Sequence, residues 1–358
     1  MRLVFFGLSL SSSWGNGHAT TYRALLRGLA AHGHDILFLE RQRPWYSAHQ
    51  DLTDPGFCEL QFYHSLEELG RWRRVLARAD AVIVGSFVPD AIAVVEWVSG
   101  IRRGSLGFYD IDTPVTLRKL AQGDSEYLSP AVMPLFDFYL SFTGGPVLKR
   151  LERRYGVQRA CKLYCSVDPA LYCPTGDPLR WDLGYIGTYS PDRQEPLRRL
   201  LIDVAVRLPD RRFVVAGAQY PQGIEWPANV ERIEHLPPSE HAAFYSSLGW
   251  ALNVTRMDMV RTGHSPSVRL FEATACGAPV ITDIWPGLED VFAPGRELLT
   301  AASTDDVIAA LALPDAARMR IGAAGRSRTL AGHTGERRAR ELAMLLADQA
   351  RGRLRRSA

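Results

Sequence analysis

Short apolar runs alternate with amphipathic helical segments along most of the chain. Apolar runs at 2–8, 35–40 and 81–87 alternate with segments in which apolar residues recur every three or four positions, such as HATTYRALLRGLAAHG. The alternation starts again with LGYIGTY, PLRRLLIDVAVRL and RFVVAGA. Strands that alternate with helices are typical of parallel βαβ units. The pattern predicts an α/β fold with two doubly wound, Rossmann-like domains facing a cleft, followed by C-terminal helices.

The domain boundaries follow from changes in this pattern. The stretch SVDPALYCPTGDPLRWD is rich in Pro, Asp and Gly and has no apolar period, which is typical of a linker. We expect a first domain over 1–166, a linker over 167–181 and a second domain over 182–332. Residues 333–358 are expected to form a C-terminal helix and a basic tail. A chain of 358 residues is long enough for two such cores.

The charge is concentrated at the C-terminal end. The formal net charge is +3, and the last eight residues contain Arg351, Arg353, Arg355 and Arg356, so the rest of the chain has a net charge of 3 − 4 = −1. The body of the protein therefore gives no indication of a nucleic-acid partner. The tail is expected to be a frayed, solvated end, with weak contact with an anionic membrane surface as the alternative.

Neither the apolar runs nor the cysteines indicate a membrane or secreted protein. MRLVFFGLSLSSSW leads directly into a loop and a helix, so it is interpreted as the first strand, and no apolar run is long enough for an integral membrane segment. Five cysteines without CxxC spacing favour reduced thiols and a cytoplasmic location. Cys161, Cys165 and Cys173 have no companion His or Asp pattern, so no metal is expected.

The candidate chemistry lies in the loops after the predicted strands, because ligands of open parallel sheets bind at the carboxyl ends of the strands. The first such loop contains Gly15, Asn16, Gly17 and His18. Glycines allow a ligand to approach the backbone closely, and the following helix offers free N–H groups. His18 is a candidate general base, and a residue that only begins the helix is the alternative.

The segment YDIDTP, residues 109–114, follows another predicted buried strand. Asp110 and Asp112 are close enough in sequence for mutual repulsion to raise the pKa of one of them, which suits a base. The structural alternative is that Asp112 and Thr113 cap the helix that starts near Pro114.

Two segments of the second domain are candidates for a nucleotide site. In GYIGTYSPDR, Gly187 and Thr188 follow a strand, and Arg193 opens the next helix, which suits a diphosphate. In HSPSVRLFEATACGAPVITD, residues 264–283, Ser265 is expected to cap a helix that begins at Pro266 and stops at Gly277.

Glu272 is the unusual residue of this helix, because a spacing of 100° per residue places it on the apolar side. An unpaired carboxylate there is unfavourable, and the hydroxyl groups of a ribose would supply donors. A salt bridge to Arg269, three residues earlier, is the ordinary alternative. Ser265, Ser267 and Arg269 are expected near the same ligand.

Together these segments resemble GT-B glycosyltransferases, and more narrowly the CgeB-type family related to spore-maturation glycosyltransferases. The resemblance covers most of the chain. It is carried by SSSWGNGHATTYRALLRGLAAHGHDILFLER, PWY at 44–46, YDIDTP, CSVDPALYCP and, most specifically, HSPSVRLFEATACGAPVITDIWPGLEDVF.

The resemblance implies a role for each candidate residue of the second domain. Glu272 would bind the nucleotide ribose, Arg269, Ser267 and Arg193 the diphosphate, and the nucleobase would lie near His235. The first domain would bind the acceptor, and no structural metal would be needed. Contacts with the acceptor or the transferred sugar are expected from six residues: Gly15, Asn16, Gly17, Thr113, Arg256 and His264.

The sequence departs from the larger retaining families in one place. Their second carboxylate, seven residues before the ribose-binding Glu, has no counterpart, because His264 and Ser265 occupy these positions. An inverting reaction would need a base, and the candidates are Asp112, Asp110 and His18, in that order.

The resulting hypothesis is a metal-independent glycosyltransferase of the hexosyltransferase class. It would use a nucleotide sugar, with UDP as the expected nucleotide, as co-substrate and need no cofactor. The acceptor would be a hydroxyl of a small molecule, a glycan or a protein. A sugar-nucleotide epimerase and a non-catalytic nucleotide-sugar-binding protein are the alternatives. A nucleotide-dependent oxidoreductase is disfavoured because the chain lacks the G-x-G-x-x-G fingerprint.

Overall fold

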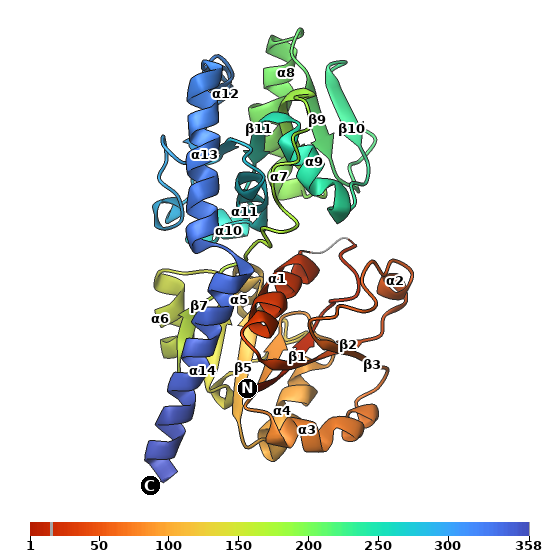
Figure 1. The fold of residues 1–358 in the computed structure, drawn as a ribbon, viewed down its shortest axis with the longest axis vertical. Helices are drawn as coiled ribbons and strands as arrows, with labels where there is room; N and C mark the ends of the chain where they lie inside the picture. The colour runs from red at the N-terminus through yellow and green to blue at the C-terminus, as the bar shows by residue number, and fades with distance from the viewer. Residues whose placement is uncertain (15–16, 358) are drawn as a thin grey trace. The chain divides into compact units, whose positions relative to one another are not determined.

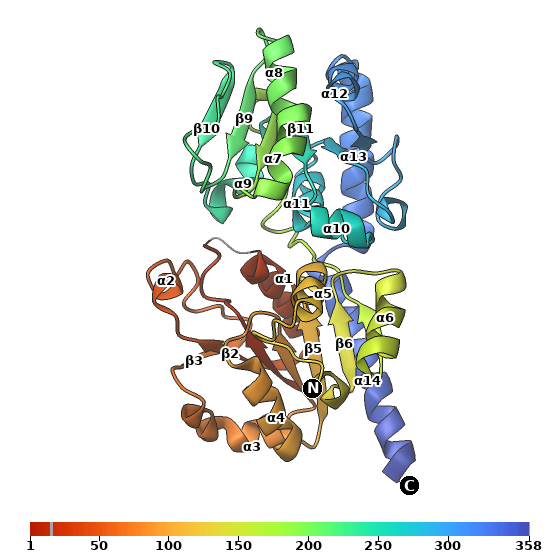
Figure 2. The ribbon, with the colours of Figure 1, turned by 180° about the vertical axis from the view of Figure 1, so that it is seen from behind.

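The computed structural model describes residues 1–14 and 17–357 and divides into two compact units. The first unit contains Met1–Ser166 and Gly335–Ala358, and the second contains Val167–Thr334. Each unit has one parallel sheet with helices on both faces (Figures 1 and 2). The prediction of two doubly wound, Rossmann-like sheets followed by C-terminal helices is confirmed.

The first unit is built on a seven-stranded sheet with the order β3-β2-β1-β4-β5-β6-β7. Every neighbouring pair of strands in it is parallel. The strands are β1 Arg2–Gly7, β2 Asp35–Arg41, β3 Glu59–Tyr63, β4 Ala81–Gly85, β5 Ser105–Asp110, β6 Phe138–Ser141 and β7 Ala160–Lys162.

The two faces of this sheet are covered by different helices. Four helices share an apolar core with one face: α3 Arg73–Arg78, α4 Ala91–Ile101, α5 Thr113–Ala121 and α6 Pro146–Tyr155. On the other face, Tyr22 of α1 His18–Ala31 packs edge-on against Phe5, Phe38 and Tyr109. The short helices are α2 Pro44–Ser47 and the 3-10 turns η1 Glu67–Trp72 and η2 Met133–Leu135.

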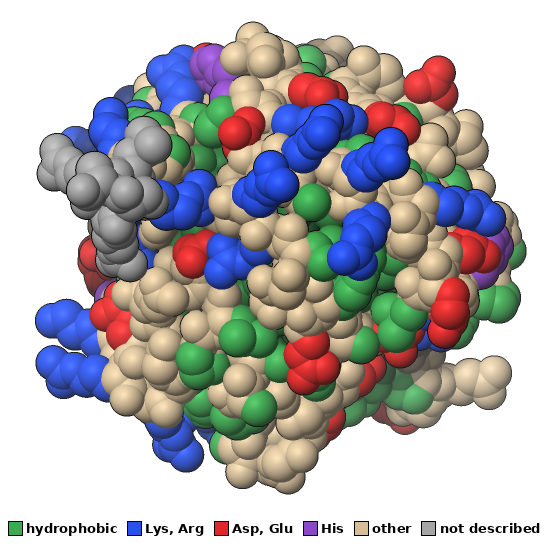
Figure 3. Space-filling model, turned by 90° about the horizontal axis from the view of Figure 1, so that it is seen from below, with side chains coloured by type: hydrophobic (Ala, Val, Ile, Leu, Met, Phe, Trp, Pro, Cys, Tyr) green, Lys and Arg blue, Asp and Glu red, His purple; other side chains and the backbone are tan. Residues whose placement is uncertain are grey.

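The last helix, α14 Gly335–Ser357, packs against α1 and completes the first unit. The helices approach closely, because a Cβ on Gly28 would lie 2.7 Å from the Gly335 carbonyl oxygen. The helix continues to Ser357 where a frayed tail was expected. Arg351 pairs with Asp348 at 2.6 Å, and the Arg353 guanidinium bonds Ser105. Figure 3 shows Lys and Arg side chains spread over the face seen from below, with Asp and Glu side chains among them.

The second unit has a six-stranded sheet with the order β10-β9-β8-β11-β12-β13. All its neighbouring pairs are parallel as well. The strands are β8 Trp181–Ile186, β9 Phe213–Ala216, β10 Val230–Ile233, β11 Leu248–Asn253, β12 Val280–Thr282 and β13 Leu299–Thr300. The segment expected as a linker, 167–181, belongs to this unit, and β8 begins at its last residue.

Helices also cover both faces of the second sheet. One face shares a core with α7 Pro191–Leu197, α8 Asp203–Arg207, α12 Thr304–Leu311 and α13 Asp315–Gly332. Helices α9 His241–Ser246 and α11 Val268–Ala275 both contact β11. The remaining turns and helices are α10 Met257–Thr262, η4 Pro238–Glu240 and η5 Leu288–Asp290.

The helix predicted from PLRRLLIDVAVRL is interrupted in the structure. A π-helical stretch, η3 Arg198–Ile202, separates α7 from α8. It follows Pro196, which lies inside α7 and has no N–H for the helical hydrogen-bond ladder. None of the described helices is both long and apolar enough to cross a membrane.

Candidate active site

The charged candidates of the second unit gather at the carboxyl ends of β8 and β11. These strands are neighbours, and the sheet is built outward from them in both directions. Ligands of doubly wound sheets bind where the strand order reverses in this way. Gly187 follows β8 directly, Arg193 lies in α7 and Arg256 follows β11.

Arg193 is a buried cation without an acidic partner in the described part of the chain. The residue is 7% exposed, its guanidinium donates to the Thr188 carbonyl oxygen, and no described residue forms a hydrogen bond with its Nε. Burial lowers the pKa of Arg193, and the positive charges of Arg269 and Arg256 act in the same direction. The nearby Asp192 carboxylate is occupied by Ser190 and the Met257 N–H. An anion beside Arg193 would be favoured.

Arg269 is held by neutral groups. Its Nη1 donates to Asn253 Oδ1 at 2.9 Å, and its guanidinium lies 5.1 Å from the centre of the Tyr185 ring. Among the described residues no carboxylate pairs with it, so the salt bridge to Glu272 that was the alternative explanation is not formed. Asn253 and Tyr185 were missed because they lie within strands that the pattern assigns to the core.

Glu272 lies on the packed side of α11, as its spacing predicts. It is 6% exposed, and Tyr245 donates its hydroxyl to Oε2 at 3.3 Å. The described residues provide no second donor. Because an ionised carboxylate accepts several hydrogen bonds, Glu272 keeps unused acceptor capacity in the same helix as the half-buried Arg269.

Gly187 has a different role from the one expected. Its N–H donates to the Ala216 carbonyl and its own carbonyl accepts from Tyr220, so its N–H is not available to a ligand. A Cβ at this position would lie 2.5 Å from the Tyr185 hydroxyl and 3.0 Å from Nη2 of Arg269. Gly187 therefore makes room for the Tyr185 hydroxyl and the Arg269 guanidinium. Thr188 takes part through its carbonyl, which orients Arg193.

The start of α11 was predicted two residues too early. Ser267, and not Ser265, is the N-cap, and its hydroxyl accepts from the Arg269 N–H at 3.4 Å. Ser265 is fully buried and donates to the Gly263 carbonyl, so it cannot reach a ligand. The chain turns at His264, which has a φ of 47°, and this delays the helix.

Three further candidates of this unit make no contact with Glu272 in the described structure. His264 Nδ1 pairs with Asp290 at 2.7 Å. Arg256 is exposed at the N-cap of α10. His235 is exposed two residues after β10, and no hydrogen bond of its side chain is formed with the described residues.

In the first unit the structure brings two catalytic candidates together. His18 Nε2 lies 2.6 Å from Asp112 Oδ2, although His18 begins α1, which follows β1, and Asp112 is the N-cap of α5, which follows β5. The Asp112 side chain is 32% exposed and that of His18 only 8%. Nδ1 of His18 is buried and has no hydrogen-bond partner among the residues that the structure describes. With Asp112 ionised, the imidazole is the only possible donor of this pair, so His18 orients the more accessible carboxylate.

The other two candidates of YDIDTP are interior residues. Asp110 is the last residue of β5 and is fully buried, which corrects the expectation of a loop position. It accepts from Tyr139 at 2.5 Å, Thr116 at 2.8 Å and the Asp112 N–H at 3.1 Å. Thr113 is buried and bonds the Asp110 carbonyl and Ser141, so it is not available to an acceptor.

The Gly-rich loop is only partly described, because Gly15 and Asn16 lie outside the described residues. Gly17 is the N-cap of α1 and has a φ of −86°, and a Cβ there would meet nothing within 4 Å. Its lack of a side chain is therefore not required by the described fold.

Two residues that hold the segment around His18 in place, Glu40 and Phe87, were not predicted. Glu40, at the end of β2, is buried and accepts from the N–H groups of Leu10 and Ser11. It fixes the start of the loop that leads to His18. Phe87 packs edge-on against His18 at 5.9 Å and has a φ of 58°, a strained backbone that is common at functional sites. Glu40 could have been noticed in the sequence, because it is a carboxylate at the end of the apolar run DILFLE.

Comparison with known proteins agrees with this architecture. A family model described as glycosyl transferase-like matches residues 193–344. No curated protein matches the chain. A sucrose-phosphate synthase from Thermosynechococcus elongatus has a TM-score of 0.71 at 14% identity, covering 98% of this chain and 99% of that one. The chain has the GT-B fold.

Other solved structures with this fold carry nucleotides. Anabaena HepE in complex with UDP and glucose has a TM-score of 0.69 at 13% identity, over 97% of this chain and 100% of that one. An alpha-glucosyltransferase in complex with UDP and a 13-mer DNA has a TM-score of 0.69 at 12% identity, over 97% and 99% of the two chains. At these identities the likeness establishes the fold.

Asp110 gives the first unit a predicted pH dependence. Burial raises the pKa of Asp110 to about 6 and outweighs the hydrogen bonds from Tyr139 and Thr116. A raised folded-state pKa contributes stability below the unfolded-state pKa of about 4, and this contribution is lost as the pH rises through about 6.

Asp110→Asn removes this titration, so its stability relative to wild type should rise by at most about 3 kcal/mol between pH 4 and pH 7. Urea unfolding of both proteins across this range measures the difference. A difference that does not change with pH would contradict the assignment, whatever its size at one pH.

Proposed function

We propose that the protein transfers a sugar from a nucleoside diphosphate sugar to an acceptor hydroxyl. One observation carries the proposal: the buried Arg193 and the half-buried Arg269 lie at the strand-order reversal without a carboxylate partner among the described residues, and the buried Glu272, in the same helix as Arg269, has unused acceptor capacity. A nucleoside diphosphate supplies both an anion for the arginines and ribose hydroxyl donors for the carboxylate. The glycosyl transferase-like match over 193–344 includes all three residues.

The donor residues have distinct tasks in this proposal. Glu272 accepts hydrogen bonds from the ribose and fixes the position of the nucleotide. Arg193 and Arg269 hold the diphosphate, and Ser267 lies at the start of the same helix as Arg269. As the bond between the sugar C1 and the phosphate oxygen breaks, negative charge grows on the diphosphate. Cations that are already fixed stabilise this charge without further reorganisation.

The acceptor side belongs to the first unit. Asp112 takes the proton of the acceptor hydroxyl while the oxygen of that hydroxyl forms a bond to C1, and the nucleoside diphosphate leaves. His18 holds the carboxylate through Nε2. Asp110 accepts a hydrogen bond from the Asp112 N–H and is itself fully buried. With a base and no second carboxylate at His264 or Ser265, the expected outcome is inversion at C1.

The finer assignments belong to the same proposal. UDP is the proposed nucleotide, in line with the UDP named for HepE and the alpha-glucosyltransferase. The reaction is proposed to need no metal. The protein is proposed to be a CgeB-type hexosyltransferase of the cytoplasm. Its acceptor is proposed to be a small molecule, a glycan or a protein.

Replacing Glu272 tests the donor site. Glu272→Gln should weaken UDP binding by about 10- to 100-fold, because one charged acceptor of ribose hydrogen bonds is lost. It should also remove the preference of wild type for UDP over 2′-deoxyuridine diphosphate. Calorimetric titration in EDTA measures both affinities.

The matched control is Glu297→Gln, another buried glutamate of the second unit, which accepts from the Ala293 N–H. It should leave UDP affinity unchanged. Equal UDP affinity in wild type and Glu272→Gln, or tighter binding of NAD than of UDP, would refute the donor assignment. Loss of UDP binding in EDTA would refute metal independence.

Replacing Asp112 tests the base. Asp112→Asn should lower kcat by about 10²- to 10⁴-fold, the usual contribution of a general base, while UDP affinity persists. His18→Ala should lower kcat less, because the carboxylate remains but is no longer oriented. UDP release from UDP-glucose is the readout, with the acceptor that wild type uses best in a panel of sugars, alcohols and phenols.

Asp124→Asn serves as the control, since Asp124 is an exposed carboxylate of the same unit that pairs with Lys119. Its kcat should equal that of wild type. Full turnover in Asp112→Asn would remove the base assignment. Conversion of the sugar nucleotide by wild type without any acceptor would favour an epimerase instead.

A further inference from the structure

A cavity of about 450 Å³ lies in the second unit, away from the residues discussed so far. Its walls include Trp181 and Asp182 at the start of β8, Arg212 just before β9 and Trp250 in β11. These are the amino ends of three neighbouring strands. Since β8 spans six residues, its two ends lie roughly 15–20 Å apart at about 3.3 Å per residue. The cavity is therefore separate from the proposed donor site.

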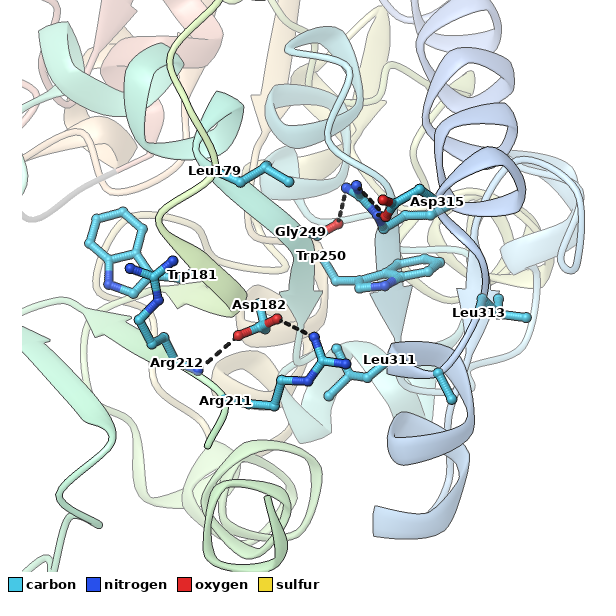
Figure 4. A pocket seen from close by; sticks show the side chains of 12 residues that line it. Leu179, Trp181, Asp182, Arg211, Arg212, Gly249, Trp250, Leu311, Leu313 and Asp315 are labelled. Atoms are coloured by element: carbon cyan, nitrogen blue, oxygen red, sulfur yellow. Dashed lines mark hydrogen bonds and ion pairs between the residues drawn. The ribbon is translucent and has the colours of Figure 1, made fainter. Parts of the chain in front are cut away.

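Both carboxylates of the cavity are already paired. Asp182 binds the Arg211 guanidinium at 2.7 Å and the Arg212 N–H at 2.8 Å, and Figure 4 shows it held between these two residues. Asp315 pairs with Arg318 at 2.9 Å. The cavity thus has two acids and three arginines, and the Arg212 guanidinium has no ion pair with the described residues. One positive charge remains for a ligand.

The rest of the lining is apolar. Leu179 precedes β8 and is 50% exposed, and Leu313, between α12 and α13, is 37% exposed. The Trp250 indole is buried between the arginines and Leu313 (Figure 4). Two leucines from distant parts of the sequence therefore expose apolar surface at one cavity, and a ligand with an apolar body would cover it.

We propose that this cavity binds a small organic anion with an apolar body, such as an aromatic carboxylate. Arg212 would pair with the anion, and Leu179 and Leu313 would contact the ring. The volume lies within the range of small-molecule sites. This site does not depend on the proposed function, because none of its residues contributes to the donor or acceptor assignments.

The experiment uses the full chain with two matched probes, 1-naphthoate and its uncharged analogue 1-naphthamide. Saturation-transfer NMR titrations give the affinity of each. Naphthoate should bind in the millimolar range or tighter, and at least about tenfold more tightly than naphthamide, because only the carboxylate pairs with Arg212. Saturating UDP should leave naphthoate binding unchanged.

Three variants assign the contacts. Arg212→Gln should weaken naphthoate binding about tenfold, as expected for one charged hydrogen bond. Leu313→Asp, which places a carboxylate at the rim, should abolish binding. Arg320→Gln is the control, since Arg320 is an exposed arginine of α13 outside the cavity. Both mutated cavity residues are exposed, so the fold should survive, which the thermal midpoint verifies.

Several results would overturn the proposal. These are no naphthoate binding by wild type, equal affinity for the two probes, displacement of naphthoate by UDP, or equal affinity in Arg212→Gln and Arg320→Gln. Failure of UDP to bind at Glu272 would leave these outcomes unaffected, so the two proposals can fail independently.

Discussion

Uncompensated positive charge inside the second unit is the constraint on which this account depends. A buried guanidinium is unfavourable unless its charge is paired and its N–H groups are bonded. The buried Arg193 and the half-buried Arg269 satisfy part of this requirement with the Thr188 carbonyl and Asn253, which are neutral. Neither Glu272 nor Asp192 forms an ion pair with either arginine in the described part of the chain, since Glu272 accepts from Tyr245 and Asp192 from Ser190 and the Met257 N–H. The fold therefore maintains an arrangement that a bound anion would complete.

In the first unit, in contrast, the buried charged groups have partners within the protein. Its interior carboxylates are satisfied by the protein: Asp110 by Tyr139 and Thr116, and Glu40 by the N–H groups of the loop after β1. These two residues fix the loops that present His18 and Asp112. The accessible carboxylate of Asp112 is therefore positioned by the buried carboxylates of Asp110 and Glu40. Asp110 and Asp112 are two residues apart, yet only the Asp112 side chain is partly exposed.

Much of the fold followed from the sequence because parallel strands are continuous apolar runs and their helices are amphipathic. The position of Glu272 followed from helical spacing. What could not be predicted depends on contacts between distant segments. The 2.6 Å approach of His18 to Asp112 joins residues 94 positions apart. The delayed start of α11 depends on a left-handed turn at His264, and the pattern gives no sign of it.

A crystal structure with UDP bound tests the central claim most directly. The account predicts ribose hydroxyls within hydrogen-bond distance of Glu272 and diphosphate oxygens on Arg193 and Arg269, with the Asn253 contact of Arg269 retained. The contrary result is UDP bound elsewhere in the second unit, or Glu272 turned toward Arg269 with no contact to the nucleotide.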